Sequence, residues 1–341
     1  MIPEYLIPYY PIPITLEREM NNFNYIQPKT LKEANQFVKD KAGSILYAGG
    51  TDALDLIKHD IIAPENVVNL KSIPNIDKMR TSPEHGIGIG ALVKIADIVE
   101  SKYINENYPV LAQAAKEVAS PQLRNMGTIG GNICQRPRCW YFREDFDCLR
   151  KNGDTCYAYD GENKYHCVIG GGPCYIVHPS DMAVALLALN AKVTIHSDSG
   201  ERTIPLSEFF ILPEDDYLKE NVLLPGEIVT EIIVPPTEAN VKSGYEKFKE
   251  RGAWDFAVVS VGAVVKVSDG KITEARIALG GVAPKPWMEI EFNNKLKGVD
   301  NNSLNGVMNI LLKDAEPLAK NEYKITLARN LTEQLLMDLI K

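Results

Sequence analysis

The chain has 341 residues, of which 45% are hydrophobic and 24% are charged, an ordinary composition for a water-soluble globular protein. Its 37 Lys and Arg residues against 45 Asp and Glu give a net charge of −8, which argues against a nucleic-acid binder because phosphate backbones attract an excess of basic residues. No apolar run reaches about 18 residues, so no membrane span is expected. The N-terminus lacks the basic region of a signal peptide, so we expect a cytoplasmic protein of two or three domains.

The first predicted elements flank a glycine turn. The sequence TLKE at 30–33 is a capping box and predicts a helix through about residue 39. A strand at 45–48 then leads through GGTD at 49–52 into a helix at 53–58. A turn between a strand and a helix is typical of phosphate-binding loops, although an isolated Gly-Gly is more often an ordinary tight turn.

A second glycine loop, with the sequence GTIGGN, occupies residues 127–132. Thr128 and Asn132 add side-chain hydrogen-bonding groups, and the glycines allow a ligand to approach the backbone. Neither loop matches the Rossmann or P-loop pattern. The elements expected before it are strands at 67–70 and 86–90 and helices near 93–99 and 110–119.

The last third of the chain is expected to be rich in β structure. The segment up to residue 235 is rich in turns, and the pattern changes to β from Gly244. The sequence SDG at 268–270 is a strong hairpin signal between two apolar runs. We therefore expect an α+β fold with a domain boundary near 236–243. The other elements expected after residue 180 are a strand at 193–196, the hairpin strands 256–267 and 272–279, and helices at 182–189, 304–318 and 324–340.

All six cysteines lie within a window of 41 residues: Cys134, Cys139, Cys148, Cys156, Cys167 and Cys174. Disulfides would require an oxidising compartment, for which nothing in the sequence argues. Zinc sites usually contain close cysteine pairs, and the only close spacing here is between Cys134 and Cys139. Iron–sulfur clusters also take four thiolates. The spacing predicts a metal site and leaves iron–sulfur and zinc both open.

Several motifs in sequence order resemble the FAD-binding medium subunit of molybdenum hydroxylases, the family that includes xanthine and carbon monoxide dehydrogenases. These motifs are AGGTD at 48–52, RNMGTIGGN at 124–132, PSD at 179–181 and RIALGGVAPKP at 276–286. The resemblance spans roughly residues 22–341. It implies a two-subdomain FAD-binding fold of the PCMH or vanillyl-alcohol-oxidase type, followed by a C-terminal α+β domain of the CO dehydrogenase flavoprotein type.

The resemblance also implies the domain limits: a proline-rich arm at 1–21, FAD-binding subdomains at 22–80 and 81–238, and the C-terminal domain at 239–341. An insertion at about 134–176 holds every cysteine. It is similar to a branch with bacterial aldehyde oxidoreductases and 4-hydroxybenzoyl-CoA reductase, whose flavin subunit binds an extra 4Fe–4S cluster. By resemblance the cluster ligands are Cys139, Cys148, Cys156 and Cys174. Cys167 competes for the fourth position.

For FAD, the two glycine loops are expected to hold the pyrophosphate, and Asp181 to bond the ribityl chain or the ring edge. Lys247 would lie near the isoalloxazine and stabilise reduced flavin, although a lone lysine is more often a solvated surface charge. No catalytic residue is expected in this chain. The full set of FAD contacts implied by the resemblance is Tyr47, Ala48, Gly49, Gly50, Thr51, Asp52, Ala53, Thr128, Gly130, Gly131, Asn132, Gln135, Asp181, Leu224 and Lys247.

The resemblance implies an FAD-binding electron-transfer subunit of a molybdenum-containing oxidoreductase, similar to aldehyde oxidoreductases. Its partners would be a large subunit with the molybdenum cofactor, a small subunit with 2Fe–2S centres, and an external acceptor such as NAD or a ferredoxin-type protein. One alternative is the flavin subunit of an aroyl-CoA reductase, in which electrons run inward. Another is a self-sufficient FAD oxidase whose cysteine loop is stapled by zinc.

Overall fold

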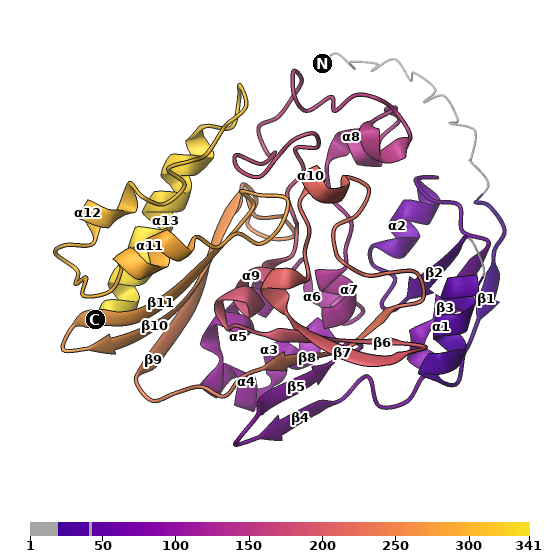
Figure 1. Cartoon of the computed structure of the whole chain (residues 1–341), viewed down its shortest axis with the longest axis horizontal. Coiled ribbons are helices and arrows are strands. Elements are labelled where there is room, and N and C mark those ends of the chain that lie inside the picture. Colours follow the sequence, from indigo (N-terminus) through magenta and orange to yellow (C-terminus); the bar gives the residue numbers. More distant parts are fainter. Residues whose placement is uncertain (1–19, 41–42) are drawn as a thin grey trace, which may run out of the picture.

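The computed structural model describes residues 20–40 and 43–341, so the predicted arm lies almost entirely outside the described residues. The chain forms three sheets (Figure 1). The first is parallel, with the order β1 (Asn24–Ile26), β3 (Asn66–Asn69), β2 (Ser44–Tyr47). The second is antiparallel, with the order β4 (Met79–Ser82), β5 (Gly86–Gly90), β8 (Ile228–Val234), β6 (Lys192–Ser197), β7 (Gly200–Pro205). The third is antiparallel, with the order β11 (Lys271–Gly280), β10 (Val259–Ser268), β9 (Val241–Phe248).

The first sheet is accompanied by α1 (Leu31–Asp40), α2 (Ala53–Lys58) and a short 3₁₀ helix (Leu70–Ser72). The predicted capping box is present, since the backbone N–H of Glu33 donates to Thr30 Oγ1 at 3.2 Å. The Glu33 carboxylate in turn accepts from the backbone N–H of Lys29 at 2.7 Å. The expected limit between residues 80 and 81 falls inside β4, which pairs with β5 in the second sheet.

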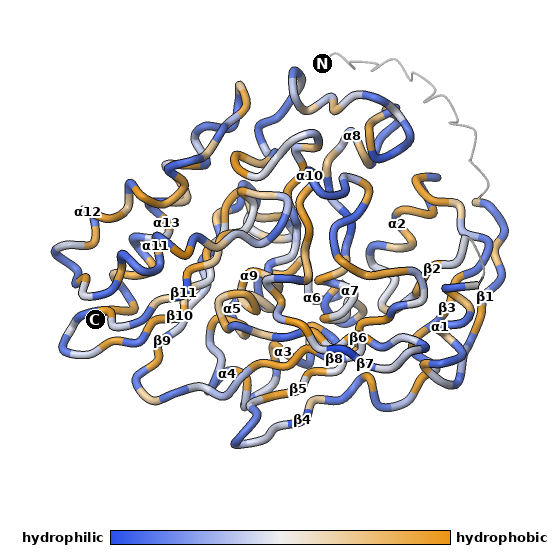
Figure 2. Tube along the Cα trace, in the orientation of Figure 1, coloured by the Kyte–Doolittle hydropathy of each residue, from blue (hydrophilic) through white to orange (hydrophobic). Residues whose placement is uncertain are grey.

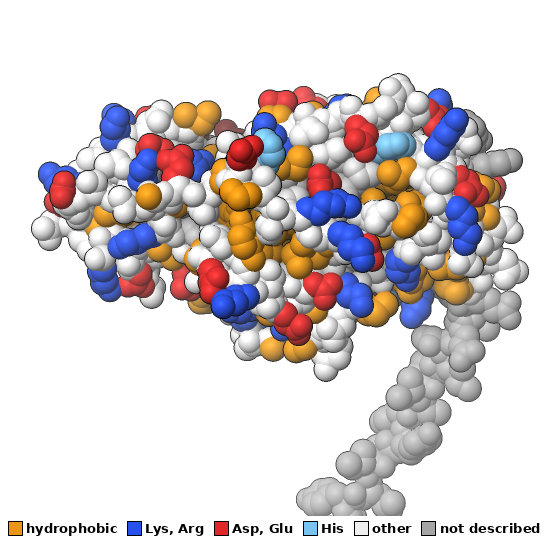
Figure 3. Space-filling view, turned by 90° about the horizontal axis from the view of Figure 1, so that it is seen from below, with side chains coloured by type: hydrophobic (Ala, Val, Ile, Leu, Met, Phe, Trp, Pro, Cys, Tyr) orange, Lys and Arg blue, Asp and Glu red, His pale blue; other side chains and the backbone are white. Residues whose placement is uncertain are grey.

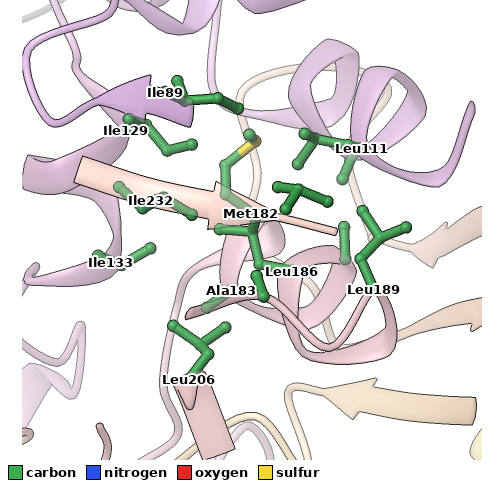
Figure 4. Close-up of a cluster of buried hydrophobic side chains, with 14 of the residues drawn as sticks. Ile89, Leu111, Ile129, Ile133, Met182, Ala183, Leu186, Leu189, Leu206 and Ile232 are labelled. Atoms are coloured by element: carbon green, nitrogen blue, oxygen red, sulfur yellow. The ribbon is translucent and has the colours of Figure 1, made fainter. Parts of the chain in front are cut away.

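The second sheet packs around α9 (Asp181–Ala188), all eight residues of which are buried. Figure 4 shows side chains of this helix meeting isoleucines of β5, α7 (Ile129–Ile133) and β8. Because the core surrounds α9, its first residue, Asp181, has a fixed position. The other helices of this region are α3 (Ile95–Glu100), α4 (Lys102–Asn107), α5 (Pro109–Glu117), α6 (Pro121–Arg124), a 3₁₀ helix (Leu206–Glu208) and α10 (Pro213–Asp216).

The turn-rich segment expected before residue 235 contains β8, a central strand of the second sheet. Its sequence, IVTEIIV, is a short apolar run that forms a buried strand because it pairs on both sides, with β5 and with β6. The cysteine segment, by contrast, is mostly irregular and holds only α8 (Trp140–Arg143) and a 3₁₀ helix (Leu149–Lys151). It lies on the same side of the molecule as α2 and α10 (Figure 1).

The C-terminal domain packs α13 (Tyr323–Ile340) against the third sheet. The hairpin of β10 and β11 is confirmed, but the helix expected at 304–318 is wrong. Only α12 (Asn305–Met308) is helical there, because the chain turns at Leu312, whose φ is +56°, and whose N–H bonds Glu289. The remaining helix is α11 (Ile290–Lys295).

Hydrophobic residues concentrate along the inner strands and α9, whereas outer loops are mostly hydrophilic (Figure 2). On the face drawn in Figure 3, Lys and Arg side chains are interspersed with Asp and Glu, so this face presents no single basic surface. None of the helices within 20–40 and 43–341 is long and apolar enough to cross a membrane.

Candidate functional site

A large cavity of about 880 Å³ lies between the first and second sheets. Its walls come from β2, the two glycine loops, the start of β8 and the loop at 251–256. This volume is typical of sites that hold a cofactor or another small molecule. Twelve of the fifteen residues expected to contact FAD line it: Ala48, Gly49, Gly50, Thr51, Asp52, Ala53, Thr128, Gly130, Gly131, Asn132, Gln135 and Asp181.

The two glycine loops meet through close backbone contacts. A Cβ atom on Gly49 would lie 2.0 Å from the carbonyl oxygen of Met126, just before the second loop. A Cβ on Gly130 would lie 2.7 Å from the Cβ of Ala91. Any side chain at either position would push the loops out of place, so glycine is required to build this wall of the cavity.

Side-chain hydrogen bonds hold the second loop in shape. Thr128 Oγ1 accepts from the backbone N–H of Gly131 at 3.2 Å, and Gln135 Nε2 donates to the Asn132 carbonyl at 2.8 Å. The Asn132 side chain accepts from Ser180 Oγ at 2.5 Å, which links the loop to the start of α9. The loop and Asp181 are therefore positioned together.

Asp181 is the centre of a buried polar group at the junction with the C-terminal domain. Lys247 Nζ donates to Asp181 Oδ2 at 2.7 Å, and the Tyr245 hydroxyl donates to Asp181 Oδ1 at 2.6 Å. The Asp181 and Lys247 side chains are only 6% and 1% exposed. Burial raises the pKa of Asp181, and the charge of Lys247 opposes this effect. Lys247 is thus no surface charge; it lies behind Asp181 and does not itself line the cavity.

Two other expected contacts also lie off the cavity wall. The ring of Tyr47 lies against Gly50 and has Lys71 Nζ 4.6 Å from its centroid. Leu224 is 61% exposed, and the neighbouring Leu223 lines the cavity instead.

Asp52 joins the first glycine loop to the cysteine segment. Its carboxylate accepts from Arg138 and Arg143 at 2.8 Å each, and from the backbone N–H of Arg136 at 2.8 Å. Arg143 also pairs with Asp55 at 2.9 Å. In this structure the Asp52 side chain therefore anchors the insertion, a role that the sequence motif did not indicate.

A small cavity within the insertion, the cysteine cavity, is lined by Cys139, Cys148, Cys156 and Cys174. All four cysteines are free, and aromatic and apolar side chains complete the walls. Cys167 is buried but does not line this cavity; its sulfur lies against Gly171. The four lining residues are the ones that the resemblance assigns as ligands.

The thiols of the cysteine cavity differ in their acidity. A hydrogen bond with Cys174 lowers the pKa of Cys156 to about 6 and raises that of Cys174, whereas burial raises the pKa of Cys139 to about 12. Thiolate is the form that binds metals. Within 20–40 and 43–341, no three His, Cys, Asp or Glu side chains are placed to hold a single metal ion.

A second cavity of about 340 Å³ connects these two places. It shares Asp181, Arg138 and Phe256 with the large cavity, and Cys139 and His166 with the cysteine cavity. The three cavities therefore follow one another through the molecule. This arrangement can bring a cofactor in the large cavity near a metal centre among the cysteines.

Sequence reasoning missed the residues that separate the large and second cavities. The Arg138 guanidinium lies 5.3 Å from the ring centroid of Phe256, and Trp254 lines the large cavity although it is 64% exposed. Arg138 stands next to a candidate ligand and could have been singled out for that reason. The loop at 251–256 carries no local motif, and only the packing of the domains brings it to the site.

Comparison with protein families gives two matches that together cover most of the chain. Residues 21–237 match the FAD binding domain in molybdopterin dehydrogenase, and residues 243–339 match the CO dehydrogenase flavoprotein C-terminal domain. Among solved structures, reconstituted CO dehydrogenase from Oligotropha carboxidovorans has a similar fold, with a TM-score of 0.75 at 22% identity. The match covers 94% of this chain and 98% of that one.

Curated proteins are similar over nearly the whole chain. The aldehyde oxidoreductase FAD-binding subunit PaoB of Escherichia coli is 35% identical over 326 residues, covering 94% of this chain and 98% of that protein. The glyceraldehyde dehydrogenase medium chain of Sulfolobus acidocaldarius is 29% identical over 273 residues, 80% of each chain. The fold expected from the sequence is confirmed, and the chain belongs to the FAD-binding medium subunits of the molybdenum hydroxylase family, which are subunits of oxidoreductases.

Proposed function

We propose that this chain is the FAD-binding electron-transfer subunit of a cytoplasmic, molybdenum-containing aldehyde oxidoreductase, and that it carries an additional 4Fe–4S cluster. Its partners are a large subunit with the molybdenum cofactor and a small subunit with 2Fe–2S centres. An external acceptor, either NAD or a ferredoxin-type protein, takes the electrons away. The 35% identity to an aldehyde oxidoreductase subunit favours this class over xanthine dehydrogenase, whose FAD-binding subunit from Escherichia coli is 24% identical.

The observation that carries the proposal is the unbroken series of three cavities. Cys139 and His166 line both the cysteine cavity and the second cavity, and Asp181 lines both the second cavity and the large one. A purely structural metal site would have no need to adjoin a cofactor-sized cavity. Adjacent redox sites are what an electron-transfer subunit requires.

The large cavity suits FAD. The glycine loops bring backbone atoms to its wall, and the aliphatic side chains of Leu70, Leu92 and Leu123 line another part of it. FAD supplies the exchange of two electrons, together or singly. Lys247 adds a buried positive charge just behind the wall, and a positive charge near the ring favours reduced flavin.

The cysteine cavity suits a four-iron cluster better than zinc. A 4Fe–4S cluster binds one thiolate at each iron, so its ligands stand apart from one another. Zinc requires all of its ligands around one point, and no such group of side chains occurs in the described residues. Cys139, Cys148, Cys156 and Cys174 would hold the cluster.

The proposal is tested by adding an aldehyde anaerobically to the purified complex and, separately, to this chain alone. We expect the flavin of the complex to be reduced and that of the isolated chain to remain oxidised. Reduction of the isolated chain would instead indicate a self-sufficient flavin oxidase. A complex that aldehydes cannot reduce, but that passes electrons from a low-potential donor to an aroyl-CoA, would indicate a reductase.

A further inference from the structure

The first turn of α13 grips the cysteine segment from the C-terminal domain. Lys324 Nζ donates to the carbonyl oxygens of Tyr165, His166 and Gly281 at 2.7, 2.9 and 2.7 Å. The amide of Asn321 donates to the carbonyls of His166 and Cys167 at 3.1 and 2.9 Å. Two side chains of one helix thus bind three consecutive peptide groups of the insertion.

Further contacts extend this grip on both sides. The backbone N–H of Lys320 donates to the side chain of the buried Asn163 at 2.9 Å, and the backbone N–H of Glu316 donates to the Val168 carbonyl at 2.7 Å. The Tyr323 hydroxyl donates to the Lys164 carbonyl at 2.9 Å. The segment 163–168 is therefore fixed by residues more than 140 positions away along the chain.

Lys324 is a buried charge that lacks a carboxylate. Its side chain is fully buried, and no Asp or Glu among the described residues forms an ion pair with it. Burial lowers the pKa of Lys324 to about 7, yet three carbonyl acceptors use all three protons of an ammonium group, which a neutral amine could not supply. An unpaired buried cation is costly unless negative charge lies nearby.

The nearest source of negative charge is the group of thiols next to His166. The backbone that Lys324 holds carries the His166 imidazole, whose Nε2 lies 3.2 Å from Cys139 Sγ. The other ring nitrogen, Nδ1, is buried and has no partner. The ring also packs edge-on against Trp140, with centroids 5.4 Å apart. A proton on Nε2 is therefore the arrangement in which His166 donates to the sulfur.

We propose that Lys324 is a positioning residue for the cysteine cluster, acting through the His166 backbone so that the imidazole donates a hydrogen bond to Cys139 Sγ. This inference rests on the cluster proposed above. Hydrogen bonds to ligand sulfurs and nearby positive charge raise the reduction potential of an iron–sulfur cluster. The C-terminal domain then has a part in electron transfer besides covering the flavin site.

The test uses the intact complex with Lys324→Met, which keeps the length of the side chain and removes its charge and donors. Lys320→Met is the matched control, since it removes a lysine from the same turn whose ion pair with Glu162 is solvent-exposed. We expect Lys324→Met to accelerate hydrogen exchange of the amides at 166–168 by about tenfold or more. We also expect it to lower the cluster potential or the iron content, while FAD per chain stays unchanged. The control should behave as wild type.

The His166 variants keep the test decisive if Lys324→Met does not fold. His166→Leu should lower the cluster potential, and His166→Gln, which retains a donor, should restore most of it. Wild-type iron, potential and exchange rates in Lys324→Met would overturn the positioning role while leaving the cluster itself intact. A wild-type complex without iron and sulfide would overturn both the cluster and this inference.

Discussion

Asp181 Oδ2 accepts a hydrogen bond from Lys247 Nζ at 2.7 Å, and the two residues come from different domains. Asp181 begins α9 in the FAD-binding region, whereas Lys247 lies on β9 of the C-terminal domain. The pair is buried, so neither charge can be satisfied by water if its partner is removed. The junction of the two domains thus lies at the wall of the flavin cavity.

Lys247→Met should lower the free energy of unfolding by about 3 kcal/mol, because it leaves the Asp181 carboxylate buried and unpaired. FAD per chain should fall as well. Adding Asp181→Asn to this variant removes the unpaired charge and should recover part of the stability. Urea unfolding of the single and double variants, with flavin content determined on each, measures both effects.

Lys249→Met is the control for Lys247→Met, because Lys249 follows the same strand and pairs with Glu117 in a partly exposed position. Its cost should be about 1 kcal/mol or less. Equal losses in the two variants would show that burial of the Asp181–Lys247 pair has no particular importance.

Much of the local structure follows from local sequence signals. The capping box at 30–33 correctly predicts α1, and the turn at 268–270 correctly predicts the β10–β11 hairpin. These signals work because the residues that determine the structure are neighbours in the chain. β8 was missed because its strand character depends on pairing with β5 and β6, which lie far away in sequence.

The site was less accessible to sequence reasoning. The cysteine positions alone left iron and zinc open, and only the fold brings Cys139 and Cys174 to one cavity while excluding Cys167. Tyr245 carries no motif, because its role comes from packing against Asp181, 64 residues earlier. Leu224 was expected at the flavin, but the chain exposes it and turns Leu223 inward.

Gly49→Ala should abolish or strongly reduce FAD binding. The added methyl group would lie 2.0 Å from the Met126 carbonyl oxygen, so the two glycine loops would have to separate. Gly252→Ala serves as control, because a Cβ atom there meets no other atom within 4 Å and the residue stands in a loop of the same cavity. Flavin absorbance per chain after purification measures the effect. A Gly49→Ala protein with full flavin content would contradict the proposed loop packing.

His178 should make the protein less stable in mild acid. Burial lowers its pKa to about 4, from an ordinary value of 6.5, so the unfolded chain binds more protons than the folded one between these values. Stability is complete above about pH 6.5 and declines as the pH falls toward 4, by up to roughly 3 kcal/mol from this group.

His178→Asn should flatten this dependence, as followed by urea unfolding at several pH values from 7 to about 4. Replacing His85, which is exposed on a turn, should leave it unchanged. A His178→Asn variant with the wild-type pH slope would assign the acid sensitivity to other groups.

The most direct test of the account is the content of iron and acid-labile sulfide per chain, with FAD, in complex purified without oxygen. With the 2Fe–2S centres of the small subunit subtracted, we expect about four irons and four sulfides on this chain. Cys174→Ser should lose them, and Cys167→Ser, outside the cysteine cavity, should keep them. Zinc in place of iron, or iron retained without Cys174, would contradict the proposed cluster.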